Sequence, residues 1–173
     1  MKNIYMFDKF DLSGFAVGVI YNKLPKIIKP GDFIYGIKSN GVHSNGFTLI
    51  RKLLKYSNYD LNELIKPTKI YTEAISLLSK YNNEIVGISH ITGGGYIDNL
   101  SRILQPNTTF QLNKWEFPDV FKWIQRESNM TYLEMMKTYN CGYGMLIITN
   151  KQIYEPYLDL LGNIVIGTQP IFC

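Results

Sequence analysis

Two glycine-rich segments, Ser39–Gly46 and His90–Gly95, restrict the possible folds of this chain more than any other feature of its sequence. Each follows a short apolar run, Asp32–Ile37 in the first case and Glu84–Ser89 in the second, with the length and composition of a buried strand. Each precedes apolar residues at helical spacing, so a strand, a glycine turn and a helix are predicted twice. This repetition is typical of a layered domain in which helices cover a sheet.

The remaining elements predict the same kind of domain. Short apolar and β-branched runs predict four further strands, at Gly14–Ile20, Thr108–Leu112, Gly142–Thr149 and Asn163–Gly167. Helical spacing predicts helices over about Tyr71–Tyr81, from Pro118 as first helical residue, over Thr131–Tyr139 and over about Tyr154–Leu161. We therefore expect a single domain over residues 1–173. Its class is α/β, or more widely α+β layered, with a mixed β-sheet packed with α-helices.

The composition argues against several classes of function. The 18 Lys and Arg outnumber the 14 Asp and Glu, but they are scattered and accompany no nucleic-acid-binding motif. A mild positive charge also suits anionic metabolites. No apolar run approaches the roughly 20 residues that span a bilayer, and no export signal is recognisable. Cys141 and Cys173 lack metal-ligand spacing, so we expect a reduced, cytoplasmic protein without nucleic-acid or membrane partners.

The glycine turns have a chemical interpretation and a purely structural one. Without side chains the backbone can approach a ligand closely, and the free N–H groups of a helix start favour an anion such as phosphate. The same glycines could instead serve only tight turns with positive φ. Neither turn fits the dinucleotide fingerprint or the P-loop pattern. The spacing alone leaves both interpretations open.

The only two histidines, His43 and His90, each lie in or beside one of these turns. His43, inside the polar loop, is the stronger catalytic candidate, whereas His90 ends an apolar strand and could simply hold its turn. Ser44 and Asn45 could cap the following helix, contact a ligand, or do both. Asn140 is a further candidate, with helix C-capping as its structural alternative. The aspartates are dispersed, so no magnesium motif is expected in this chain.

Four segments, taken in order, resemble one enzyme family. They are Gly31–Arg51 (GDFIYGIKSNGVHSNGFTLIR), His90–Leu104 (HITGGGYIDNLSRIL), Phe117–Ile124 and Met135–Met145 (MMKTYNCGYGM). The family is aminoimidazole ribonucleotide (AIR) synthetase, also called phosphoribosylformylglycinamidine cyclo-ligase, and the resemblance covers nearly the whole chain. Asp11–Phe15 also resembles the segment that leads into the family's second domain. The resemblance implies the fold of the AIR synthase C-terminal domain.

The resemblance also implies a reaction and a set of site residues. The family closes the imidazole ring in de novo purine biosynthesis. ATP activates the formyl amide oxygen of formylglycinamidine ribonucleotide, an amidine nitrogen attacks, and phosphate leaves. On this chain, His43 is expected to polarise the amide or move a proton, with Thr92–Gly95 holding an anionic group. The residues expected to bind substrate are Ser44, Asn45, Gly46, Thr92, Gly93, Gly94, Gly95 and Asn140.

In the family, a preceding domain supplies most ligands of ATP and Mg²⁺ and the core of a homodimer. We expect that this N-terminal ATP-binding domain is absent from the chain, that it acts in cis or in trans, and that the chain alone is inactive. Two alternatives stay open at this point. One is a non-catalytic metabolite-binding or interaction module, and the other is a domain of another ATP-dependent enzyme of the same superfamily.

Overall fold

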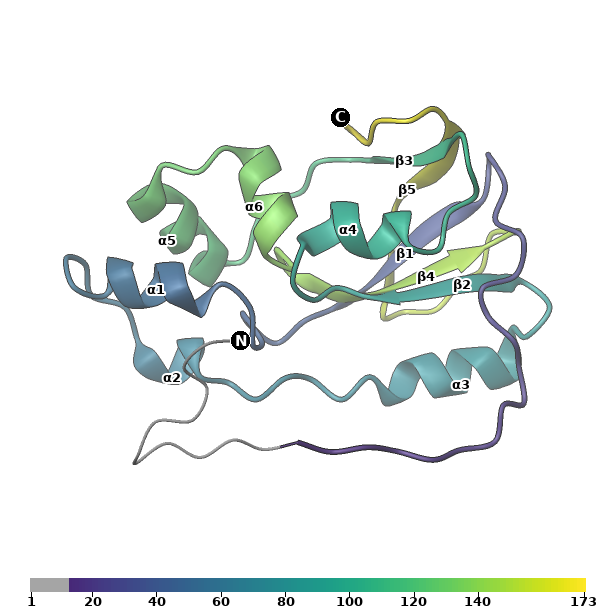
Figure 1. Ribbon diagram of the computed structural model, residues 1–173, viewed down its shortest axis with the longest axis horizontal. Helices are drawn as coiled ribbons and strands as arrows, with labels where there is room; N and C mark the ends of the chain where they lie inside the picture. The colour runs from purple at the N-terminus through teal and green to yellow at the C-terminus, as the bar shows by residue number, and fades with distance from the viewer. Residues whose placement is uncertain (1–12) are drawn as a thin grey trace.

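The computed structural model describes residues 13–173, which build a six-stranded sheet with helices on both faces (Figure 1). The strand order is β2-β4-β1-β5-β3-β6. The strands are β1 (Phe33–Lys38), β2 (Ile85–His90), β3 (Thr108–Leu112), β4 (Tyr143–Thr149), β5 (Leu158–Ile166) and β6 (Ile171–Phe172). The helices are α1 (Phe47–Leu53), α2 (Leu61–Leu64), α3 (Thr72–Lys80), α4 (Gly95–Ser101), α5 (Asp119–Ser128) and α6 (Tyr132–Thr138). Among the strands of residues 13–173 only β3 and β6 pair in parallel, so the sheet is mixed, as the sequence predicts.

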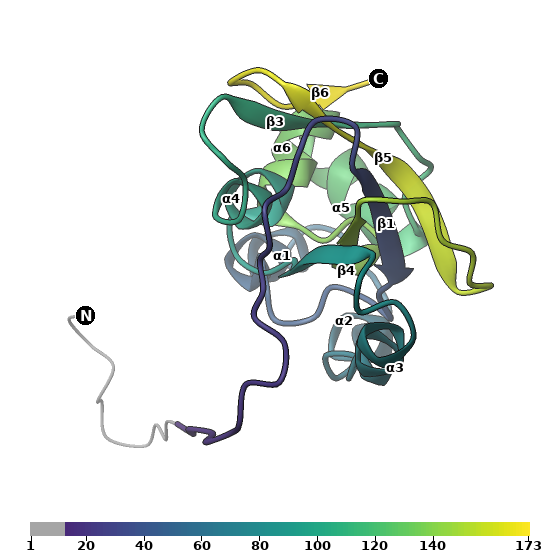
Figure 2. The ribbon, with the colours of Figure 1, turned by 90° about the vertical axis from the view of Figure 1, so that its right-hand side faces the viewer.

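Alternation along the strands creates two separate cores, one on each face of the sheet. Ile34 of β1 and Ile148 of β4 pack into the larger core, which α1, α4, α5 and α6 cover. Their neighbours Tyr35 and Ile147 point to the opposite face, where α3 packs. Figure 2 shows α3 on the far side of the sheet from α4 and α6.

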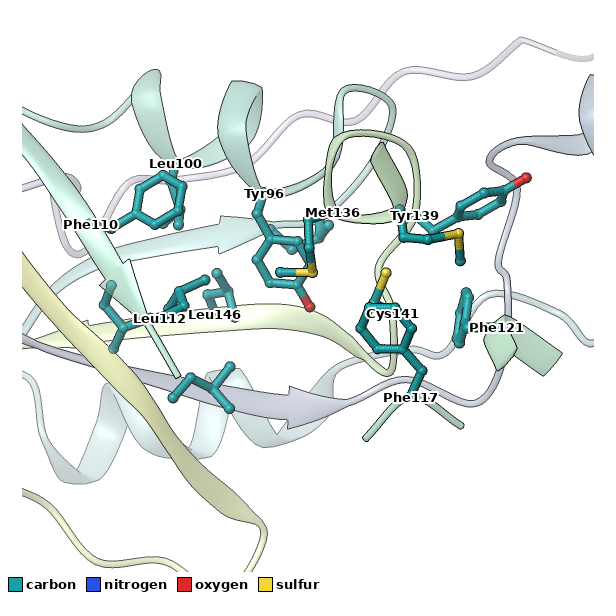
Figure 3. Packing of buried hydrophobic residues seen from close by; sticks show 14 of the residues in the cluster. Tyr96, Leu100, Phe110, Leu112, Phe117, Phe121, Met136, Tyr139, Cys141 and Leu146 are labelled. Atoms are coloured by element: carbon teal, nitrogen blue, oxygen red, sulfur yellow. The ribbon is translucent and has the colours of Figure 1, made fainter. Parts of the chain in front are cut away.

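The larger core combines aliphatic side chains with aromatic ones, among them Tyr96, Phe110, Phe117, Phe121 and Tyr139 (Figure 3). Tyr96 of α4 is fully buried, and its hydroxyl donates to the carbonyl oxygens of Asn140 and, at 3.0 Å, of Tyr143. The bonds satisfy a polar group that would otherwise be costly to bury. They also fix α4 relative to the turn that precedes β4.

The sheet order brings the two glycine turns to the same end of the molecule. Because β1 and β2 are both antiparallel to β4 and flank it, they run in the same direction and end side by side. The backbone N–H of Ser39 donates to Gly142, and that of Ile91 to Gly144, each at 2.8 Å. The start of β4 therefore lies beneath both turns.

Two predicted elements are wrong. Gly14–Ile20 forms no strand, because its backbone pairs with no strand among the described residues and its side chains are exposed. Tyr154–Leu161 is not a helix, because β5 begins at Leu158 and pairs with both β1 and β3 through Ile166. The predicted strand Asn163–Gly167 is therefore the end of a longer strand, β5, which stops at Ile166. Asp11 and Leu12 lie outside the described residues.

The helix starts differ in detail from those predicted. The residue that caps α1 is Gly46, in a left-handed conformation and without a side-chain hydrogen bond, so neither Ser44 nor Asn45 is the cap. Pro118 occupies the N-cap of α5 instead of the first helical position. The predicted strand Thr108–Leu112 is confirmed with the same bounds, and the other predicted strands and helices are confirmed to within a few residues.

Candidate functional site

The candidate site is built around Gly144, at the start of β4. A Cβ atom added there would lie 2.0 Å from the Tyr71 hydroxyl oxygen and 2.8 Å from Cε1 of His43. Only glycine leaves room for both rings at this end of the sheet. His43 comes from the first turn, and Tyr71 is the residue that precedes α3. Both side chains therefore lie against Gly144.

Three rings gather at this point. The centroid of His43 lies 6.1 Å from that of Tyr71 and 6.4 Å from that of His90, and Tyr71 and His90 are 5.8 Å apart. His43 and Tyr71 are buried, with exposed fractions of 5% and 8%, whereas His90 is exposed. The structure therefore brings both histidines together, although 46 residues separate them in the sequence, between positions 43 and 90.

The hydrogen bonds of Asn40 determine the protonation of His43. The Asn40 side-chain amide donates to the carbonyl oxygen of Pro67 at 2.9 Å, which leaves its Oδ1 facing Nε2 of His43 at 2.9 Å. That oxygen is an acceptor, so Nε2 carries the proton. The Lys69 backbone N–H approaches Nε2 only at 3.5 Å. Nδ1 therefore holds the lone pair of the neutral ring, and it is buried without a partner in the described part of the chain.

The surroundings favour the neutral form of each of these groups. Burial lowers the pKa of His43 below 6.5, and the positive charges of His90 and Lys69 act in the same direction. Burial also lowers the pKa of His90. Burial and then the Glu73 carboxylate raise the pKa of Tyr71 above 10.0, with the Gly144 backbone acting in the opposite direction. At neutral pH the site holds two neutral imidazoles and a protonated phenol.

The second group of site residues lies where the two turns face each other. A Cβ atom on Gly93 would meet Oδ1 of Asn45 at 3.9 Å and no other heavy atom within 4 Å. Ser44 and Gly93 are exposed and Asn45 is half-buried. Among residues 13–173 the side chains of Ser44 and Asn45 have no hydrogen-bond partner. The Gly93 carbonyl oxygen accepts from the Asn99 amide at 3.3 Å, so the arrangement leaves the side chains of Ser44 and Asn45 and the N–H side of Gly93 available to a ligand.

The other glycines have structural contacts that explain them. A Cβ atom would lie 2.1 Å from the Tyr139 ring at Gly46, 2.2 Å from the Asp98 carboxylate at Gly94 and 2.1 Å from the Met136 carbonyl oxygen at Gly95. All three have positive φ, which favours glycine. These positions therefore need glycine for close packing and turn geometry, whether or not a ligand binds beside them.

Thr92 and Asn140 bond to groups of the protein itself. The Thr92 hydroxyl donates to Oδ1 of Asn99, whose amide donates to the Gly95 carbonyl oxygen at 2.7 Å. Asn140 is fully buried and is not the C-cap of α6, a position that Tyr139 takes. Its Oδ1 accepts from the Ser39 hydroxyl at 2.8 Å and from the Gly142 N–H at 3.0 Å, and its amide donates to Gly41 at 2.9 Å. Asn140 thus holds the first turn in place.

A separate hollow of about 430 Å³ borders the same turn. It is lined by Ser39, Asn40, Gly41, Tyr59, Glu63, Pro118, Asp119, Val120 and Phe121. Neither His43 nor Gly93 contributes to this lining. His43 and Gly93 therefore lie outside this hollow, although Asn40, which bonds to His43, lines it.

Sequence reasoning missed Tyr71 and Asn40. Tyr71 reads as the first residue of a helix, and its contact with His43 arises where both rings pack against Gly144 of β4. Asn40 lies in the glycine-rich segment, but its effect on the tautomer of His43 depends on the distant carbonyl of Pro67. No local pattern in the sequence carries either signal.

Within residues 13–173 no three His, Cys, Asp or Glu side chains are grouped so that they could hold a metal ion. The same residues contain no helix that is long and apolar enough to cross a membrane.

The chain is similar to known proteins over most of its length. Residues 29–163 match the family described as AIR synthase related protein, C-terminal domain. Phosphoribosylformylglycinamidine cyclo-ligase from Neisseria meningitidis serogroup C is 38% identical over 94% of this chain and 52% of its own length. The protein of the same name from Chromobacterium violaceum is 37% identical over 93% of this chain and 51% of its own length. The chain thus spans about half the length of the curated relatives it matches.

Solved structures share the fold at low identity. Thiamine monophosphate kinase from Aquifex aeolicus superposes with a TM-score of 0.55 and 14% identity, over 86% of this chain and 51% of that one. A structure of AaThiL complexed with AMPPCP and TMP gives a TM-score of 0.55 and 12% identity, over 86% and 49% of the two chains. These similarities confirm the predicted fold class and show the fold alone.

Proposed function

The chain belongs to the family of AIR synthase related proteins and corresponds to their C-terminal domain. We propose that it is the substrate-binding part of a phosphoribosylformylglycinamidine cyclo-ligase. In this proposal the complete enzyme converts formylglycinamidine ribonucleotide to aminoimidazole ribonucleotide with ATP. The observation that carries the proposal is the convergence of both glycine turns, with His43, Asn45 and Gly93, at one end of the sheet. A strand end with an exposed glycine backbone and uncommitted polar side chains suits a phosphorylated substrate.

His43 fits the proton transfer that ring closure requires. The attacking amidine nitrogen loses a proton as its bond to the formyl carbon forms and phosphate departs with the oxygen. Nδ1 of His43 holds a free lone pair at neutral pH, because Asn40 keeps the proton on Nε2. A base whose pKa lies below neutrality is unprotonated and ready to accept.

The face between the turns fits the anionic end of the substrate. Ser44 and Asn45 supply uncommitted polar side chains, and Gly93 supplies backbone that a ligand can approach closely. We assign the remaining predicted residues, Gly46, Thr92, Gly94, Gly95 and Asn140, to shaping this face. In this proposal ATP, Mg²⁺, the homodimer and the cytoplasmic setting belong to the complete enzyme, whose other half supplies most of the ATP and Mg²⁺ ligands.

Calorimetric titration of the chain with formylglycinamidine ribonucleotide tests the proposal without needing turnover. We expect saturable binding, and we expect Asn45→Ala to raise Kd about tenfold, as the loss of one hydrogen bond to a charged group predicts. Asn62→Ala is the matched control, because Asn62 is an exposed asparagine on α2, outside the candidate site. A folded wild-type chain that binds no ribonucleotide would overturn the proposal.

A further inference from the structure

Two buried polar atoms beside Gly144, Nδ1 of His43 and the hydroxyl oxygen of Tyr71, are not fully hydrogen-bonded. Both atoms are inaccessible to solvent, and Nδ1 of His43 has no hydrogen-bond partner within the described residues. The Gly144 backbone N–H approaches the Tyr71 oxygen, but no described group accepts the hydroxyl proton. Buried polar groups are nearly always bonded, so two unmet groups that lie beside the same glycine require an explanation. Their residues are more than nine-tenths buried.

The two groups are complementary in kind. His43 offers an acceptor at Nδ1, because its other nitrogen carries the proton that faces Asn40. Tyr71 offers a donor, since its hydroxyl proton has no acceptor. Both atoms belong to rings that approach the same point on β4, yet they do not bond to each other. A group that presents an N–H beside an oxygen would satisfy both at once.

Packing alone does not require this arrangement. A phenylalanine at position 71 would fill the same space between α3 and the sheet without burying a hydroxyl. The tyrosine hydroxyl also forces glycine at position 144, where a Cβ atom would overlap it. Burying Nδ1 of His43 and the Tyr71 hydroxyl without full hydrogen bonding therefore reduces the stability of the unliganded protein. Such a loss of stability is common in preorganised binding sites.

We propose that Tyr71 is a further substrate-binding residue, which together with His43 recognises an amide-like or amidine-like group of the ligand. Tyr71 donates to the oxygen of that group, and Nδ1 of His43 accepts from its N–H. His90 is the exposed member of the three rings, so the proposal requires its side chain to move when the ligand enters. This inference rests on the proposed function, because the formylglycinamidine moiety contains an oxygen and N–H groups of this kind.

Titration with two probes tests the role of Tyr71. Formylglycinamidine ribonucleotide carries the recognised group, whereas ribose 5-phosphate lacks it and keeps the anionic end. We expect Tyr71→Phe to raise Kd about tenfold for the ribonucleotide and to leave Kd for ribose 5-phosphate unchanged. Tyr81→Phe is the control, because Tyr81 follows the far end of α3 and its hydroxyl donates to the Tyr154 carbonyl oxygen.

The outcomes separate this inference from the proposed function. Equal weakening of both probes by Tyr71→Phe would show an indirect structural effect and would overturn the inference. Unchanged binding of both probes would overturn it as well, and would leave the proposed function standing. If the wild-type chain binds neither probe, the proposed function fails. Nitrogen NMR of His43 supplies a second readout, in which the ribonucleotide shifts Nδ1 in the wild type but shifts it less in Tyr71→Phe.

Discussion

His43 combines an unusual backbone with an unusual environment. Its φ of 60° lies in the left-handed region, where asparagine is tolerated far better than alanine. This makes His43→Asn the substitution of choice for removing the imidazole, because it avoids adding backbone strain to the loss of the ring. The same residue gives the fold a measurable response to pH.

We expect acid to destabilise the chain partly through His43. Burial, followed by the charges of His90 and Lys69, lowers the pKa of His43 in the folded state below 6.5. Between that lowered pKa and 6.5 the unfolded chain binds more protons, so the stabilisation is complete above about pH 6.5 and falls as the pH drops. Urea unfolding at pH 7.5 and 5.5 measures the loss. His43→Asn should lose less stability than the wild type over this interval, and an equal loss would contradict the lowered pKa.

At the level of elements, the contact between α4 and α6 depends on the last glycine of the second turn. Gly95 has a φ of 58°, and a Cβ atom there would lie 2.1 Å from the Met136 carbonyl oxygen. Gly95→Ala must therefore move two helices apart, and we expect it to reduce the free energy of unfolding by about 2–4 kcal/mol. Chemical denaturation measures this change.

Gly93→Ala is the matched control for this substitution. Gly93 is two residues away in the same turn, where an added Cβ atom would meet only Oδ1 of Asn45, at 3.9 Å. We expect a change within about 0.5 kcal/mol. If both variants lose a similar free energy of unfolding, the conformation of the turn, and not the contact between α4 and α6, is what the substitutions disturb.

The elements that the sequence predicts correctly are those whose local pattern has one interpretation. Thr108–Leu112 alternates between faces and is β3 with the same bounds. Tyr154–Leu161 fits a helical pattern locally, but pairing of β5 with β1 and β3 decides its structure. Gly14–Ile20 has the composition of a strand and pairs with no strand in the described part of the chain. Long-range pairing, which sequence alone does not specify, separates these cases.

At the level of the whole molecule, the site is only partly encoded in local sequence. The glycine turns and both histidines are recognisable because each glycine segment directly follows a strand. The two turns lie side by side because β4 inserts between β1 and β2. β4 comes after both of these strands in the sequence, so the insertion is not visible in either local segment. Tyr71 and His43 both pack against Gly144 of this strand, and no local sequence pattern indicates that contact.

The extended segment Ser13–Tyr21 is the part of the described chain that contributes least to the core. It extends away from the sheet without joining it (Figure 2), and Phe15, Val17 and Val19 are 94%, 91% and 76% exposed. Exposed apolar side chains on unpaired extended backbone favour association with another strand. We expect the triple variant with Phe15→Ser, Val17→Ser and Val19→Ser to keep its free energy of unfolding within about 0.5 kcal/mol.

The same triple variant should self-associate less than the wild type in sedimentation velocity, because it removes the apolar surface without touching either core. Ile34→Ala is the contrasting control. Ile34 is fully buried on β1, so its truncation should reduce the free energy of unfolding by about 2–5 kcal/mol. A triple variant as unstable as Ile34→Ala would show that the segment packs against the domain in solution. Stability like that of the wild type, together with reduced association, would identify the segment as a surface for another polypeptide.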